Sequence, residues 1–144
     1  MQNNILHNKT FLVIEDSHVC MALIRAFLRG TGAILLTAAT GKEGWRKFTE
    51  NKVDIVIMDL RLPDTDGLSL IRELKAGNPD IPVMVQTACT VYCTENDCRE
   101  AGCDSYITKP YSHSMFLNTA EKTLEKTSRL LKDHTFVTAD RYQL

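Results

Sequence analysis

The sequence predicts an α/β fold in three layers, with helices on both faces of a doubly wound sheet of five parallel strands. Short apolar runs alternate with amphipathic segments of helical period through most of the 144 residues. The apolar runs are nearly continuous rather than alternating, which is typical of strands covered on both faces. The short spacing between runs allows only right-handed crossovers and leaves no room for a second domain.

Five apolar runs are expected to form the strands. Most are rich in Val, Ile, Leu and Met, and turn or helix signals bound each of them. Two of the runs, TFLVIE and VDIVIMD, end in acidic residues. In chain order the expected strands are residues 10–15, 33–37, 53–59, 82–87 and 104–108.

The segments between and after these runs carry apolar residues at helical spacing. In the first segment, Ile24 and Leu28 fall on one stripe. In the last segment, Glu125 and Arg129 are spaced as an i,i+4 ion pair. The expected helices are residues 18–29, 41–50, 67–76, 95–101 and a final helix that starts after Ser112 and runs to about residue 133.

Capping residues predict where several of these helices begin and end. Thr40 is followed three positions later by Glu43, which is the spacing of a capping box. Thr94 has the residue type of an N-cap for the helix that follows it. Gly30 and Gly102 follow helical segments and favour C-terminal caps.

Composition excludes several classes of protein. The chain has 44% hydrophobic residues and a net charge of −1 from 17 basic and 18 acidic residues, so it lacks the basic surface of a nucleic-acid binder. No apolar run reaches the roughly 18–20 residues that span a bilayer. The N-terminal residues MQNNILHNK lack the apolar stretch of a signal peptide, so we expect a cytoplasmic protein.

The cysteines do not have the spacing of a metal or redox site. Their number is odd, no two form a CxxC pair, and no histidine lies within residues 89–103, where four of them fall. In a reducing compartment we expect free thiols that act as small buried hydrophobic residues. The five are Cys20, Cys89, Cys93, Cys98 and Cys103.

Charged residues follow three of the expected strands. Glu15 and Asp16 close the first strand, Asp59 closes the third and Lys109 follows the fifth. The carboxyl ends of parallel strands lie along one edge of a sheet, and ligands bind outside that edge. Carboxylates held close together repel one another, so they favour a hard divalent cation and a cationic partner. This is the outline of a phosphoryl-transfer site.

Each of these residues has a chemical role in such a site. Mg²⁺ takes one or two carboxylates and keeps several waters, so we expect Asp16 and Asp59 to bind it and Glu15 to act through a water. Thr87 and Lys109 supply a hydroxyl and an ammonium for phosphoryl oxygens. The carboxylate of Asp59 would be the nucleophile and would form an acyl phosphate.

Together with Thr87-Ala88, Lys109-Pro110, Asp66-Gly67 and Ala101-Gly102, these acids resemble the receiver domain of two-component response regulators. The resemblance covers about residues 9–127 and includes the chemotaxis regulators. It leaves residues 1–8 as an N-terminal extension and residues 128–144 as the end of the last helix and a C-terminal tail. By resemblance, the strand order is the flavodoxin-like 2-1-3-4-5.

The resemblance implies a signalling switch that turns over no external metabolite. Asp59 would take a phosphoryl group from a phosphohistidine of a histidine kinase or histidine phosphotransfer protein. Mg²⁺ would be required, with the backbone carbonyl of Arg61 as its third protein ligand. Thr87 and Tyr106 would rearrange on phosphorylation, and the bond before Pro110 would be cis.

The same resemblance implies which partners the switch has. The output face would consist of residues 95–101, residues 104–108 and the last helix, and it would contact a downstream protein or domain. We expect no direct contact with nucleic acid or membrane, and a monomer or weak dimer.

Three other interpretations are open at this point. The chain has no effector segment after residue 144, so it would be a stand-alone receiver or a receiver module of a hybrid sensor histidine kinase. A receiver-like docking module that is not phosphorylated is a second alternative. A dehalogenase-like phosphatase would need an aspartate two residues after Asp59, where this chain has Arg61.

Residues 64–73 also mimic part of a calcium-binding EF-hand loop. They contain Asp64, Asp66 and Gly67, with Glu73 further on. The first ligand position of such a loop would be Leu62, which cannot bind calcium. We therefore exclude an EF-hand.

Overall fold

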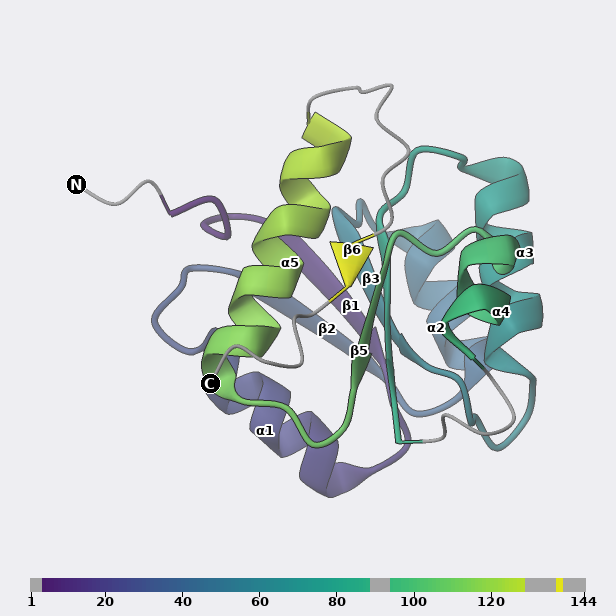
Figure 1. The fold of residues 1–144 in the computed structure, drawn as a ribbon, viewed down its shortest axis with the longest axis horizontal. Coiled ribbons are helices and arrows are strands. Elements are labelled where there is room, and N and C mark those ends of the chain that lie inside the picture. Colours follow the sequence, from purple (N-terminus) through teal and green to yellow (C-terminus); the bar gives the residue numbers. More distant parts are fainter. Residues whose placement is uncertain (1–3, 89–93, 129–136, 139–144) are drawn as a thin grey trace.

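In the computed structural model, strands and helices alternate along the chain (Figure 1). The structure describes residues 4–88, 94–128 and 137–138. The elements are β1 (Thr10–Ile14), α1 (His18–Leu28), β2 (Ile34–Ala38), α2 (Gly41–Glu50), β3 (Ile55–Asp59), α3 (Gly67–Gly77), β4 (Val83–Thr87), α4 (Glu95–Ala101), β5 (Ser105–Thr108), α5 (His113–Ser128) and β6 (Val137–Thr138).

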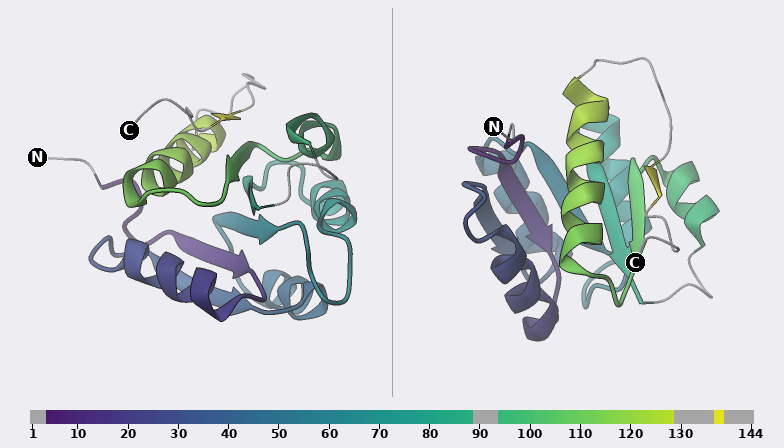
Figure 2. Two further views of the ribbon diagram at one scale, coloured as in Figure 1. Left: turned by 60° about the horizontal axis from the view of Figure 1, so that its bottom comes forward. Right: turned by 60° about the vertical axis from the view of Figure 1, so that its left-hand side comes forward.

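The first five strands form a parallel sheet in the order β2-β1-β3-β4-β5, which confirms the predicted topology. Helices α1 and α5 cover one face, and α2, α3 and α4 cover the other (Figures 1 and 2). The order reverses between β1 and β3, so the carboxyl ends of these two strands flank the crevice where ligands bind in such sheets.

A sixth strand extends this sheet. Val137 and Thr138 pair in parallel with Ser105 and Tyr106, so β6 lies outside β5. Both residues fall within residues 128–144, which were predicted to be the end of the last helix and a C-terminal tail. The pairing was not foreseen because two residues are too few for a periodic pattern.

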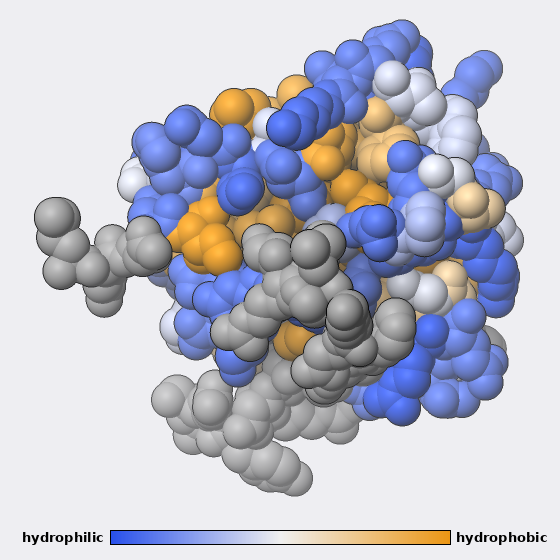
Figure 3. Space-filling model, turned by 90° about the horizontal axis from the view of Figure 1, so that it is seen from above, coloured by the Kyte–Doolittle hydropathy of each residue, from blue (hydrophilic) through white to orange (hydrophobic). Residues whose placement is uncertain are grey.

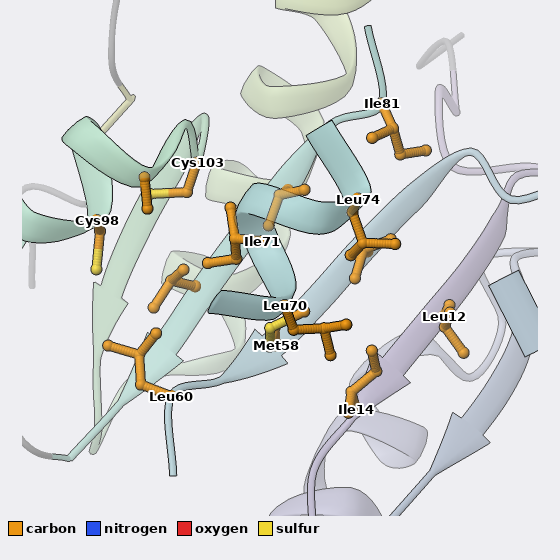
Figure 4. Packing of buried hydrophobic residues seen from close by; sticks show 14 of the residues in the cluster. Leu12, Ile14, Met58, Leu60, Leu70, Ile71, Leu74, Ile81, Cys98 and Cys103 are labelled. Atoms are coloured by element: carbon orange, nitrogen blue, oxygen red, sulfur yellow. The ribbon is translucent and has the colours of Figure 1, made fainter. Parts of the chain in front are cut away.

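Side chains of the central strands alternate between two apolar layers. On β1, Leu12 and Ile14 belong to the layer beneath α2, α3 and α4, whereas Phe11 and Val13 belong to the layer beneath α1 and α5. Figure 4 shows the first layer, where leucine and isoleucine side chains of α3 lie over β3 near Met58. All of these strand residues are fully buried, so continuous apolar runs did indicate strands covered on both faces.

The edge strand β2 differs from that expectation. Its residues are mostly half-buried, and Ile34 is 49% exposed. The reason is its place in the sheet, because β2 pairs only with β1 among the described strands. A continuous apolar run in an edge strand therefore overstates the burial of that strand.

Helix capping follows the predicted residues with one change. Thr94 and Asp97 form a capping box at the start of α4, and Gly102 ends that helix with a φ of +106°. The Thr40 side chain accepts a hydrogen bond from the Glu43 N–H, but Glu43 reaches back to the N–H of Ala39 instead of Thr40. Glu125 lies on α5, whereas Arg129 lies outside the described residues.

The carboxyl ends of β4 and β5 lie at the lower end of the molecule in Figure 1. Figure 3 shows the opposite end, which is largely hydrophilic with hydrophobic patches near its middle. Within the part of the chain that is described, no helix is long and apolar enough to cross a membrane.

Candidate functional site

The carboxyl ends of β1, β3 and β5 bring three charged side chains together. The ammonium Nζ of Lys109 lies 3.0 Å from Glu15 Oε1 and 2.9 Å from Asp59 Oδ2. Glu15 is 2% exposed and Asp59 is 8% exposed, so both ion pairs lie in a largely desolvated site. The predicted convergence of these residues is therefore confirmed.

Strand alternation explains why these side chains meet. Phe11 and Val13 pack under α1 and α5, and a period of two places Glu15 on the same side of the sheet. On β3, Ile55 and Ile57 pack in the same layer, and the period of two places Asp59 on that side as well. Each acid thus ends a row of core side chains and sits at the rim of the layer formed with α1 and α5.

Asp16 completes a cluster of three carboxylates. One ligand oxygen from each of Glu15, Asp16 and Asp59 lies within 4.8 Å of the other two, and Asp16 is exposed. The second oxygen of Glu15, Oε2, is buried without a hydrogen-bond partner in the described part of the chain. Oxygen atoms of carboxylates are the ligands that Mg²⁺ prefers, so this donor set fits a hard divalent cation that approaches from the Asp16 side.

Burial and the two partners shift the acid pKa values in opposite directions. Burial raises the pKa of Glu15 to about 7, and a hydrogen bond with Asp59 adds to the rise. Burial also opposes ionisation of Asp59, but hydrogen bonds from Glu15, Lys109 and the Arg61 N–H outweigh it and lower its pKa. Burial lowers the pKa of Lys109, but Asp59 and Glu15 raise it by more, so the ammonium stays charged. Asp59 is therefore the more acidic carboxyl of the pair, and Glu15 keeps a proton up to a pH of about 7.

The turn after β3 is built closely around Asp59. The Arg61 N–H donates to Asp59 Oδ1 at 3.1 Å, and the Gly67 N–H donates to the Leu60 carbonyl at 3.0 Å. A Cβ on Gly67 would lie 2.7 Å from Leu60 Cα and 2.9 Å from the Asp59 carbonyl oxygen. Only glycine fits at position 67, because both obstacles are backbone atoms.

The two aspartates of the excluded EF-hand pattern have structural roles. Asp64 accepts hydrogen bonds from the N–H groups of Gly41 and Lys42, at 2.7 and 2.9 Å, and so caps α2 from another loop. Asp66 is the N-cap of α3 and accepts from the Leu68 N–H. Both carboxylates bind helix N-termini, so their presence in this segment is explained by helix capping and does not require a calcium site.

Thr87 and Tyr106 lie on neighbouring strands, β4 and β5. Thr87 is the last residue of β4, and Tyr106 faces Val85 in the register of β4 and β5. Val85 and Tyr106 belong to the layer beneath α2, α3 and α4, and alternation places Thr87 on that same side. The Lys109-Pro110 bond is cis, as the resemblance implied.

Gln86 and Tyr111 were not singled out from the sequence. Gln86 is fully buried on β4 beside Asp59, and its side-chain oxygen accepts a hydrogen bond from the Tyr111 hydroxyl. The available signal was one glutamine inside the apolar run PVMVQT, because a buried amide needs a partner. The sequence does not reveal that partner.

Cys98 and Cys103 are buried at the end of α4, and Cys20 is half-buried on α1. The Cys103 N–H donates to the Cys98 carbonyl at 3.1 Å, and this bond helps to terminate α4. All three have free thiols, and those of Cys98 and Cys103 pack in the core, as expected of small hydrophobic residues. Cys89 and Cys93 lie outside the described residues.

The sequence profile of the response regulator receiver domain matches residues 11–121, a range that contains Glu15, Asp59 and Lys109. The chain belongs to this family. Receiver domains are signalling switches of two-component systems, and they interact with histidine kinases and output domains. Membership removes the dehalogenase-like phosphatase from consideration.

Two curated relatives illustrate the range of lengths among similar proteins. The transcriptional regulatory protein ZraR of Escherichia coli K12 is 30% identical over 135 residues, which are 94% of this chain but only 31% of ZraR. The polar-differentiation response regulator DivK of Brucella anthropi is 30% identical over 118 residues, which are 81% of this chain and 96% of DivK. The receiver therefore spans about a third of one relative and nearly all of the other.

A solved receiver has the same fold and a metal in its cleft. It is the receiver domain of the sensor histidine kinase PA1611 of Pseudomonas aeruginosa, with a magnesium ion coordinated in the active site cleft. Its TM-score is 0.75 and its identity 28%, and the match covers 82% of this chain and 98% of that domain.

Proposed function

We propose that Asp59 accepts a phosphoryl group from a phosphohistidine of a histidine kinase or histidine phosphotransfer protein. The observation that carries this proposal is the position of Lys109 Nζ, 2.9 Å from Asp59 Oδ2 and beside two further carboxylates. A carboxylate that stays ionised in a desolvated site, next to a fixed ammonium, has the properties of an activated nucleophile.

The transfer is a displacement at phosphorus. An oxygen of Asp59 forms the new bond to phosphorus, the bond from phosphorus to the imidazole nitrogen breaks, and its electron pair stays on that nitrogen. The product is an acyl phosphate, and water later hydrolyses it to restore the carboxylate. Lys109 already faces the Asp59 oxygen, so it neutralises phosphoryl charge without a large movement.

The metal proposed for this site is Mg²⁺. Asp16, Asp59 and the backbone carbonyl of Arg61 would hold it, and Glu15 would act through a water. When bound, the cation neutralises charge on the phosphoryl oxygens. The unpartnered buried oxygen of Glu15 supports the fit, and so does the magnesium ion in the similar PA1611 receiver.

The switch would act through Thr87 and Tyr106. Once Asp59 carries a phosphoryl group, the Thr87 hydroxyl is a donor for it, and a shift of Thr87 changes the space available to Tyr106 in the same layer. The output face would consist of α4, β5 and α5, where a downstream protein or domain binds. We place this cycle in the cytoplasm and assign no external metabolite to it.

Labelling with acetyl phosphate and Mg²⁺ tests the acceptor. The Asp59→Asn variant keeps the shape of the side chain but lacks its nucleophilic oxygen, so we expect labelling to be lost. Asp80→Asn is the matched control, because Asp80 is an exposed residue just before β4, at the opposite edge of the sheet. Undiminished labelling of the Asp59→Asn variant would refute the proposal.

A further inference from the structure

The outer edge of β5 is occupied by the C-terminal segment of the same chain. Ser105 and Tyr106 pair with Val137 and Thr138, and the Val137 N–H donates to the Asp104 carbonyl at 2.9 Å. In Figures 1 and 2 the short arrow of β6 lies beside β5, between α5 and α4. A strand of this chain thus lies on the face that consists of α4, β5 and α5.

The receiver fold does not require this strand. The family profile ends at residue 121, and the PA1611 receiver covers 82% of this chain with 98% of its own length. Without β6, β5 would be an edge strand with backbone N–H and C=O groups open to pairing. Such an edge accepts an extended segment through main-chain hydrogen bonds.

The accepting edge is held rigidly at Asp104. Its carboxylate accepts hydrogen bonds from the Val83 N–H at 2.9 Å and from Lys75 at 2.7 Å, and Lys126 lies 3.4 Å away. These contacts tie the residue to β4, α3 and α5 at once. The Asp104 carbonyl that receives β6 is therefore preorganised, which reduces the entropic cost of docking a strand.

We propose that the outer edge of β5 is a docking site for an extended peptide segment, and that residues 137–138 occupy it as a tethered competitor. The idea that this competition regulates a partner rests on the proposed function, in which this face is the output surface. A partner that pairs with β5 or covers it must first displace β6. Two strand residues make few hydrogen bonds, so β6 opens readily. The partner's apparent affinity is then its intrinsic affinity multiplied by the fraction of molecules in which β6 is open.

Hydrogen exchange on the full chain tests whether β6 is formed. Val137→Pro removes the N–H that donates a hydrogen bond to the Asp104 carbonyl. Val137→Ile keeps this N–H and serves as the control. We expect the β5 amides that face β6 to exchange on the order of 10-fold faster in the proline variant only. Unchanged protection of β1 and β3 shows that the variant is folded. Equal exchange of β5 amides in all three proteins would overturn the proposal.

A labelled peptide with the sequence of residues 134–141 tests the docking edge directly. We expect it to bind the Val137→Pro protein at least several-fold more tightly than wild type, where β6 competes for the edge. The same peptide with proline in place of its valine is the control and should not bind. Equal binding of the two peptides, or equal affinity for the two proteins, would overturn the proposal.

Acetyl phosphate labelling separates this inference from the proposed function. Val137 lies away from Asp59, so wild type and Val137→Pro should be labelled equally if Asp59 is the acceptor. If neither protein is labelled, the acceptor role of Asp59 is refuted. The proposal that β6 regulates an output surface then fails with it. The exchange and peptide results would still decide whether β6 occupies the edge.

Discussion

The hydroxyl of Tyr111 donates a hydrogen bond to the side-chain oxygen of Gln86. Burial raises the pKa of Tyr111, so the hydroxyl keeps its proton and remains a donor. The ring of Tyr111 packs 5.7 Å from that of Phe116 on α5 and 6.3 Å from that of Phe27 on α1. Because Tyr111 follows Lys109 by two residues, the hydrogen bond and the ring contacts together fix the loop after β5 to β4, α1 and α5.

Tyr111→Phe should destabilise the protein by about 1–3 kcal/mol, because Gln86 would be buried with neither end hydrogen-bonded. Urea unfolding measures the change. The double variant Tyr111→Phe/Gln86→Met removes both polar groups and should recover part of the loss. A single variant as stable as the wild type would contradict the role given to this bond.

Gly67→Ala should destabilise the protein by about 1–3 kcal/mol, since the new Cβ meets backbone atoms of Leu60 and Asp59 that cannot move aside. Gly77→Ala on the same helix is the matched control, because nothing lies within 4 Å of its added Cβ. Helix propensity makes that variant neutral or up to about 1 kcal/mol more stable. Thermal unfolding compares the two, and similar values would contradict the close approach at Gly67.

The strands and the acidic site could be predicted from the sequence, but the contacts that support them could not. The apolar runs and the charges after them predicted β1, β3 and β5 and the meeting of Glu15, Asp59 and Lys109, because strand period and parallel topology fix those positions. They did not show that Glu15 is buried while Asp16 is exposed, although the two are adjacent. That difference depends on which side of the sheet each residue faces after the strand ends.

Long-range polar contacts could not be predicted from the sequence for a similar reason. Asp64 caps α2 from the loop after β3, which requires two loops to meet at the sheet edge. Tyr111 reaches Gln86 across 25 residues, and β6 depends on only two residues. Spacing along the chain carries no signal for such pairs, because each is set by the folded geometry.

Without metal, stability should fall as the pH rises from about 4.5 to 7. The pKa of Glu15 is raised from 4.5 to about 7 in the folded state, so the folded protein binds more protons than the unfolded chain across this window. The expected loss is up to about 3 kcal/mol. Urea unfolding in chelator at several pH values measures it.

Glu15→Gln should flatten this pH profile, whereas Glu50→Gln on the surface of α2 should leave it unchanged. All three proteins contain the same four histidines, so a difference between their profiles comes from the substituted residue. The lowered pKa of Asp59 acts below this window, because its ordinary value is 3.8. A Glu15→Gln profile as steep as that of the wild type would contradict the raised pKa.

Mg²⁺ binding should weaken more in Asp16→Asn than in Glu15→Gln. Asp16 is the exposed carboxylate of the cluster, whereas Glu15 is buried and paired with Lys109, so it is expected to act through a water. Titration followed by Trp45 fluorescence or calorimetry gives the affinities, with Asp80→Asn as control. Wild-type affinity in Asp16→Asn would contradict the proposed ligand set.

The relay from Asp59 to the output face should depend on Thr87 and Lys109. Beryllofluoride, a phosphoryl mimic, is expected to change amide exchange across residues 94–112 of the wild type. Thr87→Ala removes the hydroxyl that would draw β4 toward the mimic, and Lys109→Met removes the ammonium that links it to the loop after β5. Both variants should still bind the mimic, though more weakly, and at saturation should show a much smaller exchange response.

Thr37→Ala on β2 is the matched control, because it removes a hydroxyl far from the relay. An equal response in all four proteins would exclude the relay, and no response even in the wild type would favour a docking module that is not phosphorylated.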